Sequence, residues 1–292
     1  MILDDIKKTN AIHPPQWLIP NTMYLTRMGS EAYGVSTDNS DIDIYGFCIP
    51  PRDMVFPHLA GEISGFGKQI KRFEQWTEHH CQYNGCEYDF SVYGIVKYFN
   101  LVSHNNPNMI DSIFVPENCI VHQTQISQLV RENRKSFVHK GCWHTFKGYA
   151  YQMMHKLKTK NPQGKRKELI EKYKYDVKYA YHLVRLLNEV EQLLTEGDLD
   201  LQRNNEQLKS IRRGEWTEQE IENYFTEKEK TLEKVYSESK LPWGADEDKL
   251  KNLLLQCLEI HYGKLDNCIQ IVDPAIKALQ EIAEIVNIAL KR

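Results

Sequence analysis

The sequence lacks several features that would assign its class at once. Its 292 residues contain no run of about 18 apolar residues, which excludes a membrane-spanning helix. Neither sign of charge dominates, because 37 Lys and Arg stand against 40 Asp and Glu, for a net charge of −3. This balance excludes a protein that coats nucleic acid by bulk charge, although it allows a basic groove on part of the surface.

Cysteine is present, but in no regular framework. The seven cysteines are an odd number, which indicates reduced thiols in a cytoplasmic protein and no disulfide scaffold. The first residues, 1–8, include acids where an export signal would have a basic stretch, so we expect no export by this route. No Gly-x-x-x-x-Gly-Lys-Ser/Thr loop occurs, which disfavours kinase-like phosphoryl transfer.

The pattern along the chain changes near its middle. Residues 1–135 hold most of the prolines and several short β-rich runs, whereas the pattern from residue 136 onward is helical. The spacing of apolar residues predicts helices over 142–157, 168–195, 217–238, 246–261 and 273–291. Thr217 and Glu220 predict a capping box, and Gly197 suits the end of a helix. We therefore predict an α+β protein with a mixed domain over 1–135 and an all-helical domain over 136–292.

The stretch 28–46 is the most informative part of the sequence. After an extended run, Gly29 permits a tight turn and a close approach of another group, and Ser30 is placed to cap a short helix. Free N–H groups at a helix start attract an anion, and the Ser30 hydroxyl adds a donor. This turn alone is weak evidence for a phosphate site.

Two carboxylates follow in the sequence Asp41-Ile42-Asp43-Ile44. On a strand, Asp41 and Asp43 project from one face while the two isoleucines project from the other. Carboxylates held this closely repel each other, and one or two divalent cations relieve the repulsion. By itself, the pattern is also compatible with a strand end that carries exposed aspartates.

The combination of Gly-Ser, a ten-residue spacer and Asp-Ile-Asp-Ile resembles the active-site signature of the DNA polymerase β-like nucleotidyltransferase superfamily. The resemblance implies a small mixed sheet, a phosphate-binding helix and a third carboxylate on a neighbouring strand. The run 88–93 leads into a helix predicted from Val92 to Ser103, and Asp89 is the candidate for this third carboxylate. Glu87 is its rival, and Asp89 could instead be a helix cap.

Further segments narrow the resemblance to the RNA-repair-pathway branch of the superfamily, found in bacteria and phages. They are 103–116, 146–150, 173–187 and 205–216. The chain departs from the branch pattern at three positions, with Asn105 in place of Gly, Asp111 in place of Glu and Tyr45 where an Arg often stands. The last departure leaves any role of that Arg open, whereas the metal-binding carboxylates are retained.

One predicted helix carries a polar stripe. Lys178, His182 and Arg185 are spaced i, i+4 and i+7, so they share a face. Such a stripe beside a triphosphate could bind its charge, with Arg185 able to make a bidentate contact. Without the resemblance, a solvated helix face would be the simpler reading.

A basic loop over 156–167 has six Lys and Arg in twelve residues, with Tyr149, Tyr151, Tyr173 and Tyr175 nearby. It could follow an RNA backbone while the aromatic rings stack on bases, or it could be a solvated connector. The candidate RNA-binding residues are Lys158, Lys160, Lys165, Arg166 and Lys167.

The segment 79–86 contains two His and two Cys, which are zinc-ligand types. Their spacing matches no zinc template, so we favour a hairpin that turns at Asn84-Gly85.

We therefore expect a template-independent nucleotidyltransferase that uses Mg²⁺, with Mn²⁺ as a substitute. Gly29, Ser30 and the polar stripe would hold a nucleoside triphosphate, and Asp41, Asp43 and Asp89 the metal. The resemblance implies an RNA 3′ end as acceptor, for example a cleaved tRNA. The alternatives are transfer of AMP to a protein or a small molecule, and a catalytically silent RNA-binding protein.

Overall fold

The computed structural model describes residues 1–36, 41–69, 71–159, 165–265 and 282. Its strands are β1 (Thr22–Arg27), β2 (Ile42–Cys48), β3 (Gln75–Tyr83), β4 (Cys86–Gly94) and β5 (Ile120–Gln123). The helices are α1 (Ile2–Lys8), α2 (Gly29–Ala32), α3 (Arg52–Val55), α4 (Ile95–Ser103), α5 (Pro107–Phe114), α6 (Gln125–Glu132), α7 (Cys142–Thr159), α8 (Lys165–Tyr173), α9 (Val177–Glu196), α10 (Asn205–Arg212), α11 (Glu218–Glu238) and α12 (Glu247–Tyr262). The predicted α+β class is confirmed.

The five strands form one mixed sheet in the order β3-β4-β2-β1-β5. Strands β2 and β4 are parallel, while β1 pairs with β2 and β5, and β3 with β4, in antiparallel fashion. The β3–β4 hairpin turns at Asn84 and Gly85, which have φ angles of 50° and 78°. Two successive positive φ angles are typical of the tight turn predicted there.

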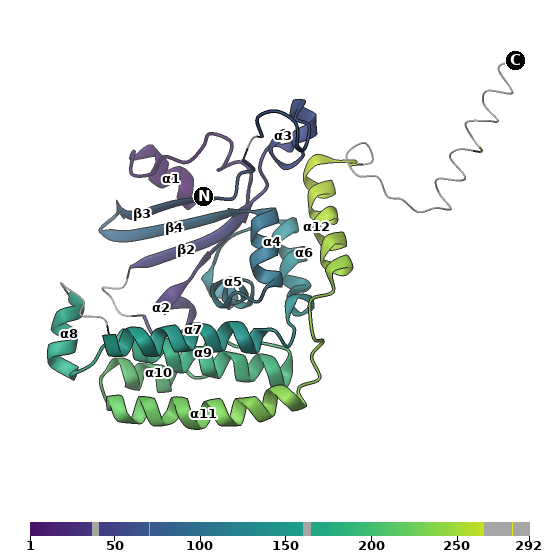
Figure 1. Cartoon of the computed structure of the whole chain (residues 1–292). Helices are drawn as coiled ribbons and strands as arrows, with labels where there is room; N and C mark the ends of the chain where they lie inside the picture. The colour runs from purple at the N-terminus through teal and green to yellow at the C-terminus, as the bar shows by residue number, and fades with distance from the viewer. Residues whose placement is uncertain (37–40, 70, 160–164, 266–281, 283–292) are drawn as a thin grey trace, which may run out of the picture.

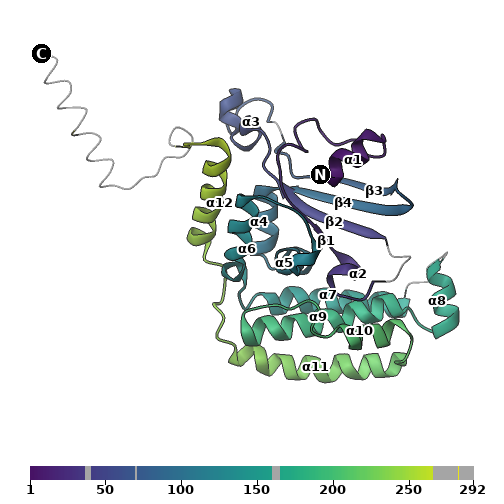
Figure 2. The ribbon, with the colours of Figure 1, turned by 180° about the vertical axis from the view of Figure 1, so that it is seen from behind.

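The sheet separates two hydrophobic clusters. On one face, Leu3, Ile6 and other residues of the N-terminal segment cover Ile44, Phe90 and Val92. On the opposite face, the sheet packs against the helices of the larger cluster. Figure 1 shows α1 on one side of the sheet and α5, α7 and α9 on the other, and Figure 2 shows the same layers from behind.

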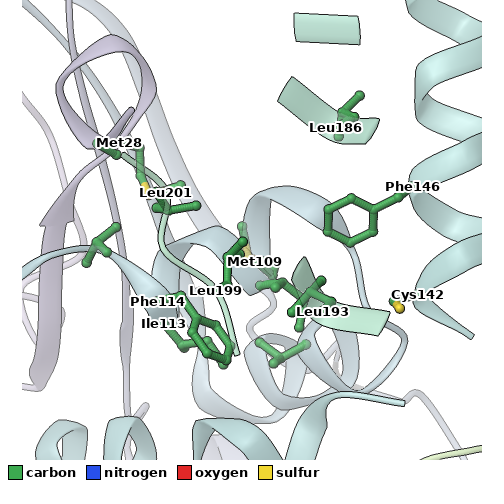
Figure 3. Close-up of a cluster of buried hydrophobic side chains, with 14 of the residues drawn as sticks. Met28, Met109, Ile113, Phe114, Cys142, Phe146, Leu186, Leu193, Leu199 and Leu201 are labelled. Carbon is green, nitrogen blue, oxygen red and sulfur yellow. The ribbon is translucent and has the colours of Figure 1, made fainter. Parts of the chain in front are cut away.

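The larger core crosses the predicted domain boundary at residue 135. Figure 3 shows Met28 and Phe114, from the first half of the chain, in the same cluster as Phe146 and Leu193 from the second half. The two halves therefore share a continuous hydrophobic core, although their division into two domains stays a prediction.

Several predicted element boundaries are wrong by a few residues or more. The predicted helix 168–195 is two helices, α8 and α9, because Asp176 caps the start of α9 and accepts hydrogen bonds from the backbone N–H groups of Lys178 and Tyr179. Helix α4 begins at Ile95, since Val92 and Tyr93 still pair within the sheet. The helix predicted over 273–291 lies outside the described residues.

Two predicted helix ends are confirmed. Thr217 and Glu220 form the reciprocal hydrogen bonds of a capping box at the start of α11. Gly197 ends α9 with a φ of 62°, the left-handed conformation that glycine adopts at low cost.

One departure from the family pattern has a structural explanation. Asn105 has a φ of 51°, a conformation that asparagine tolerates better than most other residues with a side chain. Its buried amide donates hydrogen bonds to the carbonyl oxygens of Val102 and Phe137.

None of the helices built from described residues combines the length and apolar composition that a membrane crossing needs.

We expect Phe146→Ala to lower the free energy of unfolding by about 3–5 kcal/mol, because Phe146 is fully buried in the shared core. Urea unfolding followed by tryptophan fluorescence and circular dichroism should give a single transition. The control Ile63→Ala, at a side chain that is 64% exposed, should change stability by no more than about 0.5 kcal/mol. Two separated transitions, of which only one shifts, would contradict a shared core.

Candidate active site

The turn after β1 brings the chain against β2. Gly29 has a φ of 62°, and a Cβ atom at this position would lie 2.3 Å from Oδ2 of Asp43. The backbone N–H of Met28 donates to the carbonyl oxygen of Asp43 at 2.8 Å. Only glycine therefore fits at position 29, and the group that approaches it closely is the Asp43 carboxylate.

Ser30 does not cap this helix. The N-cap of α2 is Met28, no side chain bonds to the free N–H groups at its start, and Ser30 lies within the first turn. The predicted cap is wrong because α2 begins at Gly29, two residues before the helix that a Ser30 cap would start. Ser30 is half-buried beside Gly29.

Two of the predicted carboxylates lie side by side. Asp43 and Asp89 are direct partners in the parallel pairing of β2 with β4, where neighbouring strands are about 4.8 Å apart. Burial raises the pKa of Asp43, and repulsion from Asp89 and Asp41 raises it further, while Lys178 lowers it. Asp41 is exposed and directly precedes β2.

Asp89 lies in the interior of β4, so it is not a helix cap. One carboxylate oxygen accepts the backbone N–H of His80 at 2.8 Å and lies 3.5 Å from Nδ1 of His79. Glu87 instead contacts Nδ1 of His80 at 2.6 Å and accepts a hydrogen bond from Gln82. The strand register therefore places Asp89, and not Glu87, opposite Asp43.

The carboxylates provide the oxygen ligands that Mg²⁺ and Mn²⁺ prefer. Within the described part of the chain, however, no three His, Cys, Asp or Glu side chains are grouped closely enough to hold a metal ion. This holds for the aspartates and for the His and Cys residues of 79–86. A cation held by Asp41, Asp43 and Asp89 together would therefore require these side chains to come closer to one another.

A cavity of about 380 Å³ opens beside Gly29 and Asp43. It lies where β2, α5, α7 and α9 meet, between the sheet and the helical half of the chain. The lining residues are Met28, Gly29, Tyr33, Asp43, Tyr45, Asn108, Tyr149, Gln152, Met153, Lys156, Lys178, Tyr179, His182, Arg185 and Leu186. The predicted turn, carboxylate and polar stripe thus all reach one cavity.

The three residues of the stripe differ in their surroundings. Lys178 is exposed, and its charge favours the ionised form of Asp43 across the cavity. His182 is half-buried, with its ring 4.1 Å from that of Tyr181. Arg185 is only 5% exposed.

Arg185 is held by protein carboxylates. Its Nη1 atom donates to Oδ2 of Asp111 on α5 and to both oxygens of Glu189 on α9, at 3.0 and 3.1 Å. The hydroxyl of Tyr33 donates to the same Asp111 oxygen at 2.8 Å, and the guanidinium lies 4.2 Å from the centre of the Tyr33 ring. These bonds engage Nη1, whereas Nε is buried with no hydrogen-bond partner among the described residues, so a contact of Arg185 with a phosphate stays a prediction.

We refer to Tyr33, Asp111, Arg185 and Glu189 as the Arg185 cluster. Burial raises the pKa of Glu189 well above its ordinary value, because desolvation outweighs the attraction of Arg185. Burial also raises the pKa of Asp111, with Arg185 and the Tyr33 hydroxyl acting against the shift. Burial therefore disfavours the ionised form of both carboxyls, and the Arg185 guanidinium favours it.

The candidate RNA-binding residues are only partly described. Lys158 forms an ion pair with Glu222 at 2.9 Å, and Lys167 is exposed, 3.9 Å from Glu171. Lys160 and the side chains of Lys165 and Arg166 lie outside the described residues. An RNA path along these residues stays a prediction.

Of the nearby tyrosines, Tyr175 is buried and donates its hydroxyl to the carbonyl oxygen of Trp216, so it is not available to stack on a base.

Sequence reasoning missed the contribution of α7 and α5 to the cavity. Tyr149, Gln152, Met153 and Lys156 are spaced i, i+3, i+4 and i+7, so they form one face of α7. This periodicity was visible in the sequence, but it does not show that the face meets a cavity. Asn108, on α5, carried no comparable signal.

The fold and the site together define a nucleotidyltransferase of the polymerase β type. A mixed sheet places a glycine turn beside paired carboxylates, and basic residues of a helix face them. The family RlaP, described as the RNA repair pathway DNA polymerase beta family, matches residues 2–248. The chain therefore belongs to this family, as the sequence resemblance predicted.

Among solved structures, the chain is similar to a nucleotidyltransferase-like protein from Exiguobacterium sibiricum. The identity is 10%, the match covers 85% of this chain and 71% of that chain, and the TM-score is 0.29. A comparison with curated proteins gives no match.

We expect Arg185→Met to lower the free energy of unfolding by about 3–5 kcal/mol, because it leaves two buried carboxylates without a cation. Glu189→Gln is the matched control, since it keeps the size and shape of the side chain, and we expect a smaller loss because burial favours the neutral form of Glu189. Chemical denaturation at neutral pH should separate the two variants clearly. Equal losses for both would show that Glu189 is ionised in the folded protein.

The difference in stability between the wild type and the Glu189→Gln control should depend on pH. The folded-state pKa of Glu189 is raised, so the folded protein binds more protons than the unfolded chain above the ordinary Glu pKa. The wild type should therefore lose stability, relative to Glu189→Gln, as the pH rises from the ordinary Glu pKa towards the folded-state value.

Proposed function

We propose that the protein transfers a nucleoside monophosphate from a nucleoside triphosphate to an acceptor hydroxyl at an RNA 3′ end, without a template, and releases pyrophosphate. The observation that supports this most strongly is Asp43, which lines the cavity beside the Gly29 turn and is paired in register with Asp89 on the neighbouring strand. A protein that only binds RNA gains nothing from neighbouring, mutually repelling carboxylates.

The triphosphate would lie between the Gly29 turn and α9. Gly29 and Ser30 would approach it through the backbone and the Ser30 hydroxyl, and Lys178 and His182 would contribute positive charge and hydrogen-bond donors from the facing helix. Arg185 would act indirectly, by holding α9 in place through its buried carboxylates.

Asp41, Asp43 and Asp89 would hold the divalent cation, Mg²⁺ or Mn²⁺. When bound, the ion would screen the charge of the phosphates and favour ionisation of the acceptor hydroxyl. The raised pKa of Asp43 fits this assignment, because burial and, after it, repulsion from Asp89 disfavour the ionised form, which a cation would favour.

The transfer itself requires no covalent enzyme intermediate. The acceptor oxygen gives its proton to the Asp89 carboxylate and forms a bond to the α-phosphorus. The bond between the α-phosphorus and the oxygen bridging to the β-phosphate breaks, and that oxygen leaves with the pyrophosphate. The carboxylate can accept the proton on Oδ2, since the backbone N–H of His80 binds Oδ1 at 2.8 Å.

An RNA acceptor, such as a cleaved tRNA, is proposed from the family and from the basic residues of 156–167. The cytoplasm, where such RNA and reduced thiols occur, is the proposed location. Transfer of AMP to a protein or a small molecule is a distinct possible outcome of the assay below.

We expect label from one or more α-labelled nucleoside triphosphates to enter RNA in the presence of Mg²⁺. The test is incubation with each of four triphosphates and with pools of tRNA or cellular protein. The Asp41→Ala, Asp43→Ala double variant should lower the rate by about 1000-fold or more, since several kcal/mol of charge stabilisation are lost.

The control variant is Asp53→Ala, which removes a carboxylate on α3, outside the residues that line the cavity. Label in protein would move the assignment to AMPylation. Absence of label from every acceptor would favour the RNA-binding alternative.

A second prediction concerns the divalent cation and needs no turnover. Mg²⁺ should raise the unfolding temperature of the wild type, because it relieves the repulsion between Asp43 and Asp89. Asp43→Asn should abolish this increase and, without Mg²⁺, should unfold at the same or a higher temperature than the wild type. An equal effect of Mg²⁺ on both proteins, followed by differential scanning calorimetry, would place the cation elsewhere.

A further inference from the structure

The cavity has two chemically different ends. Nζ of Lys156, near the end of α7, lies 5.9 Å from the ring of Tyr179, near the start of α9, so the two helices run in opposite directions along the cavity. Lys156 and Lys178 therefore belong to the same end. This end also faces Asp43, whose pKa Lys178 lowers. It is the end suited to phosphates and a cation.

The other end is formed by α5 and the middle of α7, and it is aromatic and amide-rich. Tyr149 of α7 lines it, and its hydroxyl accepts a hydrogen bond from Nδ2 of Asn106 at 3.0 Å. Asn106 is itself the N-cap of α5 and accepts the backbone N–H of Met109. The Tyr149 ring is thus held in one orientation by the start of a helix.

Asn108 lines the same end of the cavity, one residue beyond the proline that begins α5. Its side-chain amide forms no hydrogen bond with any other residue that the structure describes, whereas the amides of Asn105 and Asn106 are both bonded. A half-buried amide next to a fixed aromatic ring has the donor and acceptor that the edge of a nucleobase requires.

We propose that this end is an adenine-reading subsite, in which Tyr149 stacks on the base and the Asn108 amide makes paired hydrogen bonds to its edge. The proposal rests on the proposed function, since it assigns the base of the triphosphate whose phosphates lie at the opposite end. Stacking between a base and an aromatic side chain contributes affinity for any base, so the selectivity for adenine comes from Asn108.

The charges around the cavity favour adenine. Guanine is commonly read by two N–H groups of one Arg or by Lys, but Nη1 of Arg185 is bonded to Asp111 and Glu189, its Nε is buried, and the lysines belong to the phosphate end. Cytosine is commonly read by a carboxylate, and Asp43 is the one acid among the described lining residues. An amide with both a donor and an acceptor matches the amino group and ring nitrogen of adenine.

Equilibrium binding to the full chain in Mg²⁺, without an acceptor, tests the subsite. The probes are the four nucleoside triphosphates and inorganic tripolyphosphate, which has no base. The wild type should bind ATP about ten-fold more tightly than the other three, which corresponds to about 1.4 kcal/mol. Asn108→Ala should remove this preference and leave the affinity for tripolyphosphate unchanged.

Two variants of Tyr149 separate stacking on the base from the base selectivity that Asn108 provides. Tyr149→Ala should weaken all four triphosphates about ten-fold but not tripolyphosphate, whereas Tyr149→Phe should keep most of the affinity. Asn100→Ala, at an exposed asparagine of α4, is the matched control. If Asn108→Ala does not fold, the isosteric Asn108→Asp serves instead and should also lose the preference for ATP.

Equal affinity of the wild type for all four triphosphates, or a preference for ATP that survives in the Asn108 variants, would overturn the subsite. A parallel weakening of tripolyphosphate in the Tyr149 and Asn108 variants would do the same, since it would show a general structural role. Selective binding of ATP without label transfer to any acceptor would overturn the proposed reaction but leave the subsite standing.

Discussion

The buried charge of Arg185 constrains the arrangement of the whole site. Asp111 is fully buried and Glu189 is 2% exposed, so both carboxylates depend on this guanidinium for compensation. Removing one partner of such a cluster leaves an uncompensated charge in a medium where charges are costly. Because Asp111 comes from α5 and Tyr33 directly follows α2, the cluster fixes α9 against both helices. The position of the Gly29 turn relative to Lys178 follows from this contact.

The site places charges of opposite sign on different parts of the fold. The acids lie on parallel strands of the sheet, and the bases lie on α9, on the other side of the cavity. Neither group is neutralised within its own element, since Asp43 faces Asp89 and is only partly offset by Lys178. The small net charge of the chain therefore hides a strong local separation. Shared packing of the two halves supplies the free energy that holds these groups in place.

The features that could be predicted from the sequence are those that local chemistry determines. The alternation of Asp43 with Ile44 places one side chain at the site and the other in the core, because successive strand residues point to opposite faces. The Asn84-Gly85 hairpin and the Thr217 capping box depend on contacts between residues no more than three positions apart. The family could also be predicted from the sequence, because its motifs are local patterns of residue types, and the family model matches residues 2–248.

The features that could not be predicted depend on partners distant in the chain. Helical periodicity correctly placed Arg185 on the face that meets the cavity, yet its role depends on Asp111, 74 residues earlier. Because protein carboxylates bind Nη1 of this guanidinium, Arg185 also holds α9 against α5, which its place on the helix face does not reveal. The position of Asp89, and not Glu87, opposite Asp43 likewise depends on the register of β4 against β2, and a shift of two residues would have exchanged the two carboxylates. Periodicity in the sequence shows which side chains share one face of a helix or strand. The role of each side chain depends on the residues that this face contacts in the folded protein.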